Sequence, residues 1–173
     1  ECQLEYPLRL LKEGLTHTQR VYRGVYEFTN LVKPNTILDK KLYNLKEILS
    51  EYLKHTAYNS QVIIDDLVTI PVNESLFCTA IDNLIRNGLK YNDSPTKYVK
   101  IYMQDGSLVV EDNGRGMNCE EFEYLSKPYT RRANQKEGGT GLGLNICIGI
   151  LKEHGFAVSC EQLTQGTKLV IHL

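Results

Sequence analysis

The sequence contains no tryptophan, only two methionines and only five cysteines among its 173 residues. The cysteines are odd in number, and no two have the CxxC spacing that is typical of zinc sites and redox motifs. Reduced cysteines therefore fit this chain better than a disulfide scaffold or a zinc site. Cys78 and Cys147 lie in apolar helical patterns, where we expect each thiol to be buried like a small hydrophobic side chain.

The chain also lacks an excess of charge and a long apolar run. Twenty basic residues balance twenty-one acidic ones, which disfavours a surface that binds nucleic acid. No stretch approaches the roughly 20 apolar residues that a membrane span requires, and Glu1-Cys2 does not begin a signal peptide. We expect a soluble, cytoplasmic segment without membrane contact of its own, although its parent protein can be membrane-anchored.

The residues that are present suit one domain with a short appendage, since 42% are hydrophobic and 24% are charged. Apolar residues between Leu4 and Val32 recur at three- and four-residue steps, which predicts a helical segment over residues 1–35. For residues 36–173 we expect an α+β domain, a sheet with helices packed on one face. The predicted helices cover 42–57, 73–91 and 142–154, and the predicted strands cover 36–38, 62–64, 98–103, 108–111, 156–158 and 167–173.

The helix predicted over 73–91 carries the first group of polar candidates. Asn83, Asn87 and Lys90 are spaced by four and three residues, so they share one helix face. An amide oxygen is a suitable Mg²⁺ ligand when phosphate oxygens supply the rest, and a lysine neutralises phosphate charge. Tyr91 offers an aromatic face for a base. A solvent-facing polar stripe explains the same spacing equally well.

A second group follows a predicted strand, in the stretch Glu111–Met117. Asp112 at a strand end is able to accept a hydrogen bond from an exocyclic amine such as that of adenine. Gly114 and Gly116 permit a close backbone approach that larger residues forbid. Taken alone, Asp-Asn-Gly is also common turn chemistry.

Two further stretches offer phosphate contacts. Arg131 and Arg132 follow an aromatic residue at the start of a polar loop over 127–139, where a solvated basic loop is the alternative. The glycine-rich turn over 138–143 opens the third predicted helix and offers free N–H groups to phosphates. It is not a Walker A loop, because no Gly-Lys-Ser/Thr follows.

In order and spacing, these four stretches resemble the asparagine box, first glycine box, phenylalanine box and second glycine box of histidine kinases. Those kinases belong to the larger ATPase group of gyrase, the heat-shock chaperone and the mismatch-repair protein. The resemblance covers about residues 36–173. It implies a two-layer sandwich of a mixed sheet on about three helices, with ATP beneath a flexible lid. Residues 1–35 would be a remnant of the dimerisation and phosphoacceptor domain.

The resemblance also implies roles for the matching residues. Asn87 would coordinate Mg²⁺, with Asn83 supporting the polar site. Lys90 would contact phosphate, Tyr91 the nucleotide and Asp112 the adenine amine.

The glycine-rich turns and the lid complete the implied site. Leu125 departs from the pattern, since the phenylalanine box often has phenylalanine there. The other implied nucleotide ligands are Gly114, Gly116, Arg131, Gly139, Thr140, Gly141, Leu142, Gly143 and Leu144.

One position separates the branches of this ATPase group. The gyrase-like members carry a water-activating glutamate four residues before the magnesium asparagine, and here that position is Asn83. Without a carboxylate there, hydrolysis lacks its base. We therefore expect transfer of the γ-phosphoryl group to another nucleophile.

No histidine in the chain has the setting expected of a phosphoacceptor. His17, His55, His154 and His172 all lack the acidic and Pro-Leu pattern that follows such a residue, and His154 is expected to be structural. The opening Cys2–Leu8 echoes the end of that pattern, but chance similarity is the preferred explanation. The phosphoacceptor either lies upstream or has been lost.

The sequence thus predicts the ATP-binding kinase domain of a two-component sensor histidine kinase. Its cofactors would be ATP and Mg²⁺, and its partner would be a response regulator receiver domain. A homodimer would form through the N-terminal helices of the full-length protein. The alternatives are a catalytically degenerate signalling scaffold and, with less support, a gyrase-type ATPase.

Overall fold

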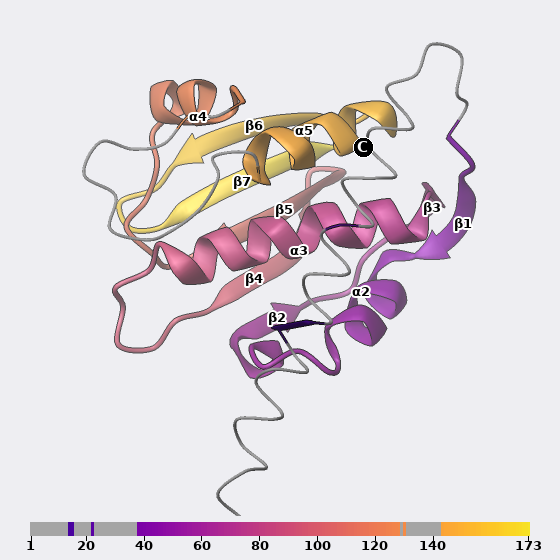
Figure 1. Ribbon diagram of the computed structural model, residues 1–173, viewed down its shortest axis with the longest axis horizontal. Helices are drawn as coiled ribbons and strands as arrows, with labels where there is room; N and C mark the ends of the chain where they lie inside the picture. The colour runs from indigo at the N-terminus through magenta and orange to yellow at the C-terminus, as the bar shows by residue number, and fades with distance from the viewer. Residues whose placement is uncertain (1–13, 16–21, 23–37, 129, 131–142) are drawn as a thin grey trace, which may run out of the picture.

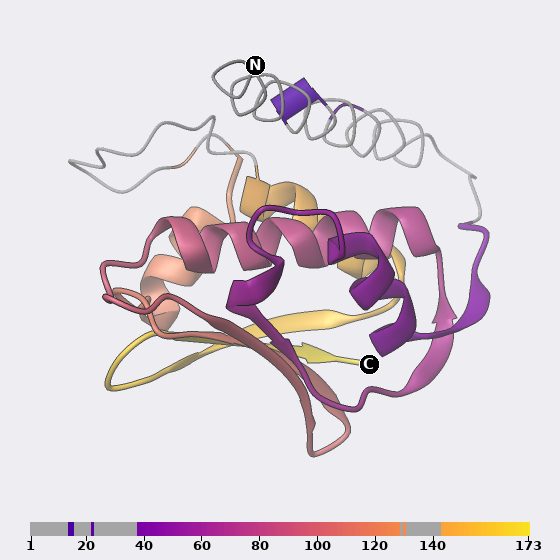
Figure 2. The same ribbon diagram turned by 90° about the horizontal axis from the view of Figure 1, so that it is seen from below.

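The computed structural model describes residues 14, 15, 22, 38–128, 130 and 143–173. Three helices, α2 (Leu45–Leu53), α3 (Glu74–Lys90) and α5 (Gly143–Glu153), lie on one face of a five-stranded sheet (Figures 1 and 2). The predicted α+β sandwich is therefore confirmed. In sheet order the strands are β2 (Val62–Ile64), β4 (Val99–Gln104), β5 (Ser107–Asp112), β7 (Thr167–His172) and β6 (Ala157–Gln162).

The sheet is mixed, because β2 runs parallel to β4 whereas the other neighbouring strands are antiparallel. The tight turn between β4 and β5 places Asp105 and Gly106 at positive φ, 48° and 77°. Two successive residues at positive φ give a turn whose twist matches that of the strands. The strands predicted over 98–103 and 108–111 are thus joined as a tight hairpin.

The core fills the space between the helices and the sheet. Helix α3 begins after Asn73, whose side-chain oxygen accepts a hydrogen bond from the Leu76 N–H. Phe77 and Ile81 on α3, Ile101 on β4 and Ile150 on α5 are completely buried. The amphipathic helices thus bury their apolar sides against one face of the sheet.

The other face of the sheet carries a row of alternating charges. Lys100 on β4 pairs with Glu111 on β5, Glu111 with Lys168 on β7, and Lys168 with Glu161 on β6. The Lys168 ammonium lies 2.6 Å from the Glu161 carboxylate. Opposite charges on neighbouring strands stabilise the pairing and give this face no excess of either sign.

One predicted helix has the wrong bounds, and one strand was missed. The helix predicted over 42–57 spans only Leu45–Leu53, because Lys41–Asn44 form strand β1 and Asn44 caps α2. Strand β1 pairs with β3 (Thr69–Val72), which was not predicted since Pro71 disfavours strand pairing. Both apolar runs pair in a separate ribbon rather than in the main sheet.

A short helix, α4 (Cys119–Leu125), was also missed. It lies beside β6 and begins after Asn118, whose side chain accepts a hydrogen bond from the Glu121 N–H. Its buried Phe122 packs in the core. Seven residues give too few repeats to make a helical pattern visible in the sequence.

The N-terminal helix predicted over 1–35 lies largely outside the described residues, and so does the strand predicted over 36–38. Gly14, Leu15 and Tyr22 are helical, and Leu38 is in no strand. Among the described helices, none has the length and apolar character of a membrane span. Cys78 and Cys147 are buried free thiols, as expected.

Candidate functional site

Asp112 lies at the end of β5, where two backbone N–H groups hold its carboxylate. Its Oδ1 accepts a hydrogen bond of 2.8 Å from Gly114 and one of 3.3 Å from the Thr167 N–H. Burial raises the pKa of Asp112, while the hydrogen bonds from Gly114 and Thr167 act in the opposite direction. A partly buried carboxylate held in this way is suited to accept a further hydrogen bond from a ligand.

Two glycines allow other segments to approach Asp112 closely. A Cβ atom on Gly88 of α3 would lie 2.9 Å from the Asp112 Cβ and 3.2 Å from its Oδ2. A Cβ atom on Gly114 would lie 2.8 Å from the Tyr91 carbonyl oxygen. Larger residues at these positions would separate α3 from β5. The absence of side chains at Gly88 and Gly114 therefore sets the distance between α3 and the Asp112 carboxylate.

Gly116 and Gly166 form a second close approach behind Asp112. Both have positive φ, 79° and 86°, and a Cβ atom on Gly116 would lie 3.0 Å from the Gly166 carbonyl oxygen. A Cβ atom on Gly166 would lie only 1.8 Å from the Asp112 carbonyl oxygen. The β6–β7 turn therefore packs directly on the loop that follows β5.

A buried amide pair joins the end of α3 to the same loop. The Asn92 Nδ2 donates to the Asn113 Oδ1 at 2.8 Å, and Asn92 is only 1% exposed. Nearby, the Arg115 N–H donates to the Tyr91 carbonyl oxygen at 3.1 Å. Ser94 adds a bond of 2.6 Å from its hydroxyl to the Asn113 carbonyl oxygen. These contacts hold the end of α3 and the loop after β5 against each other.

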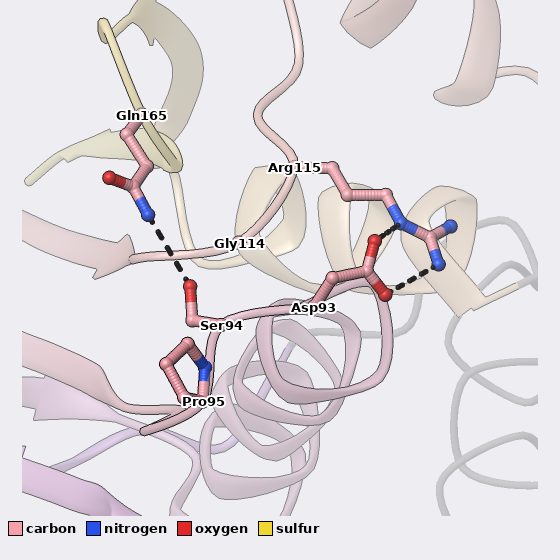
Figure 3. A pocket seen from close by; sticks show the side chains of 6 residues that line it. All are labelled: Asp93, Ser94, Pro95, Gly114, Arg115 and Gln165. Atoms are coloured by element: carbon pink, nitrogen blue, oxygen red, sulfur yellow. Dashed lines mark hydrogen bonds and ion pairs between the residues drawn. The ribbon is translucent and has the colours of Figure 1, made fainter.

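A cavity of about 320 Å³ borders this junction through Gly114 (Figure 3). On one side, the Arg115 guanidinium donates two hydrogen bonds to the Asp93 carboxylate. One runs from Nε to Oδ2, and the other runs from Nη2 to Oδ1 at 2.9 Å. On the other, the Gln165 amide points toward the Ser94 hydroxyl at 3.4 Å. Pro95 completes the lining.

The polar residues predicted on α3 do not share one environment. Asn83 is half-buried and lies near the Cys147 thiol on α5, whose pKa is raised by burial while the Asn83 side chain acts in the opposite direction. Asn87 is half-buried. Lys90 is exposed, with its ammonium 5.1 Å from the centre of the Tyr91 ring. Asn87, Lys90 and Tyr91 thus occupy the end of α3 that packs on Asp112.

Several predicted nucleotide ligands lie outside the described residues, namely Arg131, Gly139, Thr140, Gly141 and Leu142. Gly143 and Leu144 form the first turn of α5 and are half-buried. A Cβ atom on Gly143 would meet nothing within 4 Å. Leu125, where the box pattern departs, ends α4 and is half-buried.

Asp82 is the carboxylate nearest in sequence to Asn83, and it faces away from solvent. It is 6% exposed and accepts a hydrogen bond from the Tyr58 hydroxyl. Burial and the Asp82 charge raise the pKa of Tyr58, so the phenol stays protonated and keeps donating. The ring of Tyr58 also lies 5.9 Å from the Arg86 guanidinium carbon.

The histidines have different surroundings. His154 is buried and structural, as expected: its Nδ1–H donates to the Ile150 carbonyl oxygen at 2.8 Å and its Nε2 accepts from the Asn73 N–H at 3.0 Å. His172 on β7 bridges Ser159 on the neighbouring strand β6 and Ser107 on β5. His55 is exposed, and His17 lies outside the described residues.

Comparison with known proteins decides the family. Residues 72–173 match the model of the histidine kinase-, DNA gyrase B- and HSP90-like ATPases, a range that contains Asn87, Asp112 and the glycine turns. The chain belongs to this family. The resemblance based on the four boxes is thereby confirmed.

Within this ATPase family, relatives of the chain are named histidine kinases. Sporulation kinase C of Bacillus subtilis is 32% identical over 155 residues, covering 83% of this chain and 35% of that protein. The mycobacterial sensor histidine kinase MprB has the same fold, with a TM-score of 0.62 at 21% identity over 76% of this chain and 95% of that one.

A structure of full-length ShkA in complex with AMPPNP has a TM-score of 0.65 at 20% identity, covering 99% of this chain and 38% of that one. The chain spans at most about a third of the length of the curated relatives it matches.

Sequence reasoning missed four residues that build this site. Gly88, Asn92, Gly166 and Thr167 all contact Asp112 or the loop that follows it, yet none was predicted as a site residue. Gly166 lies between the strands predicted over 156–158 and 167–173. A glycine followed by threonine at the start of the last strand was the available sign, but only the sheet order brings it to Asp112.

Proposed function

We propose that this chain binds Mg²⁺-ATP and passes the γ-phosphoryl group to a histidine, as the ATP-binding domain of a two-component sensor histidine kinase. One observation carries the proposal: Gly88 and Gly114 bring the end of α3 directly against the Asp112 carboxylate. The proposal includes relay to a response regulator receiver domain. It also includes a cytoplasmic location and dimerisation through helices to which residues 1–35 belong.

Asp112 recognises adenine. Its Oδ1 is engaged by Gly114 and Thr167, while its Oδ2 lies next to Gly88, where any side chain would intrude. Since a carboxylate oxygen accepts hydrogen bonds only, it pairs with the exocyclic amine of adenine and rejects a carbonyl at that position. This predicts a preference for ATP over GTP.

Asn87, Lys90 and the first turn of α5 contact the phosphate end of the nucleotide. The half-buried Asn87 offers an amide oxygen of the kind Mg²⁺ accepts beside phosphate oxygens. The exposed Lys90 ammonium supplies positive charge.

Transfer to a histidine is favoured over hydrolysis, because neither Asn83 nor Asp82 on α3 offers an accessible carboxylate to activate water. A water-activating base needs an accessible carboxylate near the phosphate. Asn83 replaces it at the expected position, and Asp82 is buried against Tyr58. The role of Asn87 and Lys90 is therefore to position the nucleotide and to neutralise its phosphate charge, as phosphoryl transfer requires.

The test uses the longer parent protein with its upstream helices. With γ-labelled ATP and Mg²⁺, we expect acid-labile label on the protein, and Asn87→Ala should reduce the labelling at least about tenfold by weakening the binding of Mg²⁺-ATP. His55→Ala is the matched control, because His55 is exposed and outside the site. Nucleotide binding without acid-labile phosphate would favour the degenerate scaffold. A failure to bind ATP would sink both forms of the proposal.

A further inference from the structure

Cys119 and Cys160 lie across the contact between α4 and β6. The Cys119 thiol donates to the Cys160 carbonyl oxygen at 3.1 Å, and the Cys160 thiol points back to the Met117 carbonyl oxygen at 3.5 Å. Each sulfur thus touches the backbone of the segment that carries the other. Neither thiol belongs to the nucleotide contacts proposed above.

The two thiols differ in access. Cys119 is the first residue of α4 and is exposed, whereas Cys160 is 8% exposed. Burial and, to a smaller extent, the neighbouring Cys119 raise the pKa of Cys160 to about 11. An oxidant from solvent therefore meets Cys119 first, with Cys160 shielded directly behind it.

The other described cysteines do not share this arrangement. Cys78 donates only to the Ile48 carbonyl oxygen at 3.8 Å, deep in the core. Cys147 is fully buried on α5. Cys119 and Cys160 are thus the described pair in which an accessible thiol lies beside a second one.

We propose that Cys119 and Cys160 form a reversible disulfide when a peroxide reaches the protein. The Cys119 thiolate attacks the peroxide, the O–O bond breaks, and a sulfenic acid and hydroxide are formed. The Cys160 sulfur then attacks the sulfenic sulfur, forming the S–S bond and expelling hydroxide, which takes up the Cys160 proton as water. Two thiols are oxidised and one peroxide is reduced to water.

The crosslink would fasten α4 to β6 next to the loop that follows Asp112. That loop already packs on the β6–β7 turn, where Gly116 faces Gly166. A bond between residues 119 and 160 closes a long stretch of chain, so the oxidised protein should unfold at a higher temperature than the reduced one.

The experiment treats the whole 173-residue chain with hydrogen peroxide. A Cys2→Ser background removes the one cysteine that lies outside the described residues, so only the four described cysteines can react. Peptide mapping without reductant should find one linked pair, 119 to 160, with the mass of two hydrogen atoms lost. Dithiothreitol should remove it. The melting temperature should rise on oxidation and return on reduction.

Cys119→Ser and Cys160→Ala should each abolish both the linked peptide and the shift in melting temperature. Cys119→Ser is the cleaner variant, since the exposed side chain leaves the core intact. Cys147→Ala is the control that keeps the crosslink. Recovery of Cys119 as sulfinic acid, or in a link between two chains, with no 119–160 peptide, would overturn the proposal.

Discussion

At the scale of single residues, Asp112 is held in the site at a cost to folding. Its pKa is raised above the ordinary value, chiefly by burial. The folded protein therefore binds this proton more tightly than the unfolded chain does. The corresponding stability is present at acidic pH and is lost as the pH rises through the folded pKa, so the ionised carboxylate at neutral pH opposes folding.

Replacing Asp112 with asparagine should separate function from stability. Asp112→Asn keeps an oxygen for the Gly114 and Thr167 donors but offers an amide, a donor, in place of Oδ2. We expect an ATP analogue to bind at least about tenfold more weakly, while the free energy of unfolding at pH 7 stays equal or rises. Calorimetric titration and urea unfolding measure the two quantities. Full affinity for the analogue would contradict the assigned role.

Gly88 is expected to be required for packing. Gly88→Ala would gain up to about 1 kcal/mol of helix propensity but would force Cβ to within 2.9 Å of the Asp112 Cβ. Overpacking of this kind costs about 1–3 kcal/mol. We expect a net loss of unfolding free energy together with weaker nucleotide binding.

The matched control for stability is Gly143→Ala on α5, which meets open space and should not destabilise. Urea unfolding of both variants decides the matter. Equal stability of the two would show that the close contact is relieved without cost.

At the scale of elements, the end of α5 is tied to the start of α3 and to the chain that enters the domain. His154 at the end of α5 accepts a hydrogen bond from Asn73, the N-cap of α3. The Lys40 ammonium donates to the His154 carbonyl oxygen at 2.8 Å, and the Asn73 amide donates to the Asp39 carbonyl oxygen. The His154 ring also stacks on Phe156. His154 thus joins three segments, with its imidazole accepting from Asn73 and its carbonyl oxygen accepting from Lys40.

This junction should make stability depend on pH. Burial lowers the pKa of His154 below 6.5, and the nearby Lys40 charge lowers it further. A protonated Nε2 could not accept from Asn73. Because the unfolded chain then binds the proton more tightly, the stability is present above pH 6.5 and is lost as the pH falls through the folded pKa.

Urea unfolding of wild type and His154→Gln between pH 7.5 and about pH 5 measures this contribution. We expect the variant to be less stable at pH 7.5 and to lose less stability on acidification. His55→Ala, an exposed position, should follow the wild-type profile. Parallel curves for all three proteins would remove His154 as the cause.

At the scale of the whole molecule, the site joins segments from three parts of the chain. Helix α3, the loop after β5 and the β6–β7 turn meet only because β5 lies between β4 and β7 in the sheet. A ligand that contacts all three should stabilise the entire fold, since it binds the folded state alone.

Mg²⁺-ATP analogue should therefore raise the melting temperature of the chain. At a concentration 100-fold above its dissociation constant, it should add about 2.7 kcal/mol to the free energy of unfolding. Asn87→Ala and Asp112→Asn should each remove most of the shift, and GTP should produce less of it. Scanning calorimetry with and without nucleotide measures the effect. An equal shift with GTP would contradict adenine recognition by Asp112.

The sequence alone determined the helical and strand pattern of the main domain and the family. The apolar periodicity of α3 and the Asp-Gly turn before β5 act locally, over a few residues, so they are visible without a fold. The four boxes identified the candidate residues because their order along the chain is distinctive. The sequence did not reveal β1, which was interpreted as the start of a helix, nor β3 or α4, where a proline and a short length hide the pattern.

Only the tertiary structure decided which residues surround Asp112. Gly88 lies 24 positions before it and Thr167 lies 55 positions after it, and no local rule connects such distant positions. The strand order brings them together, and the absence of a Cβ atom on Gly88, Gly114 and Gly166 permits the close contact. The same packing turned Asn83 toward Cys147 and Asp82 toward Tyr58. Those directions depend on burial, which the spacing of residues along one helix does not specify.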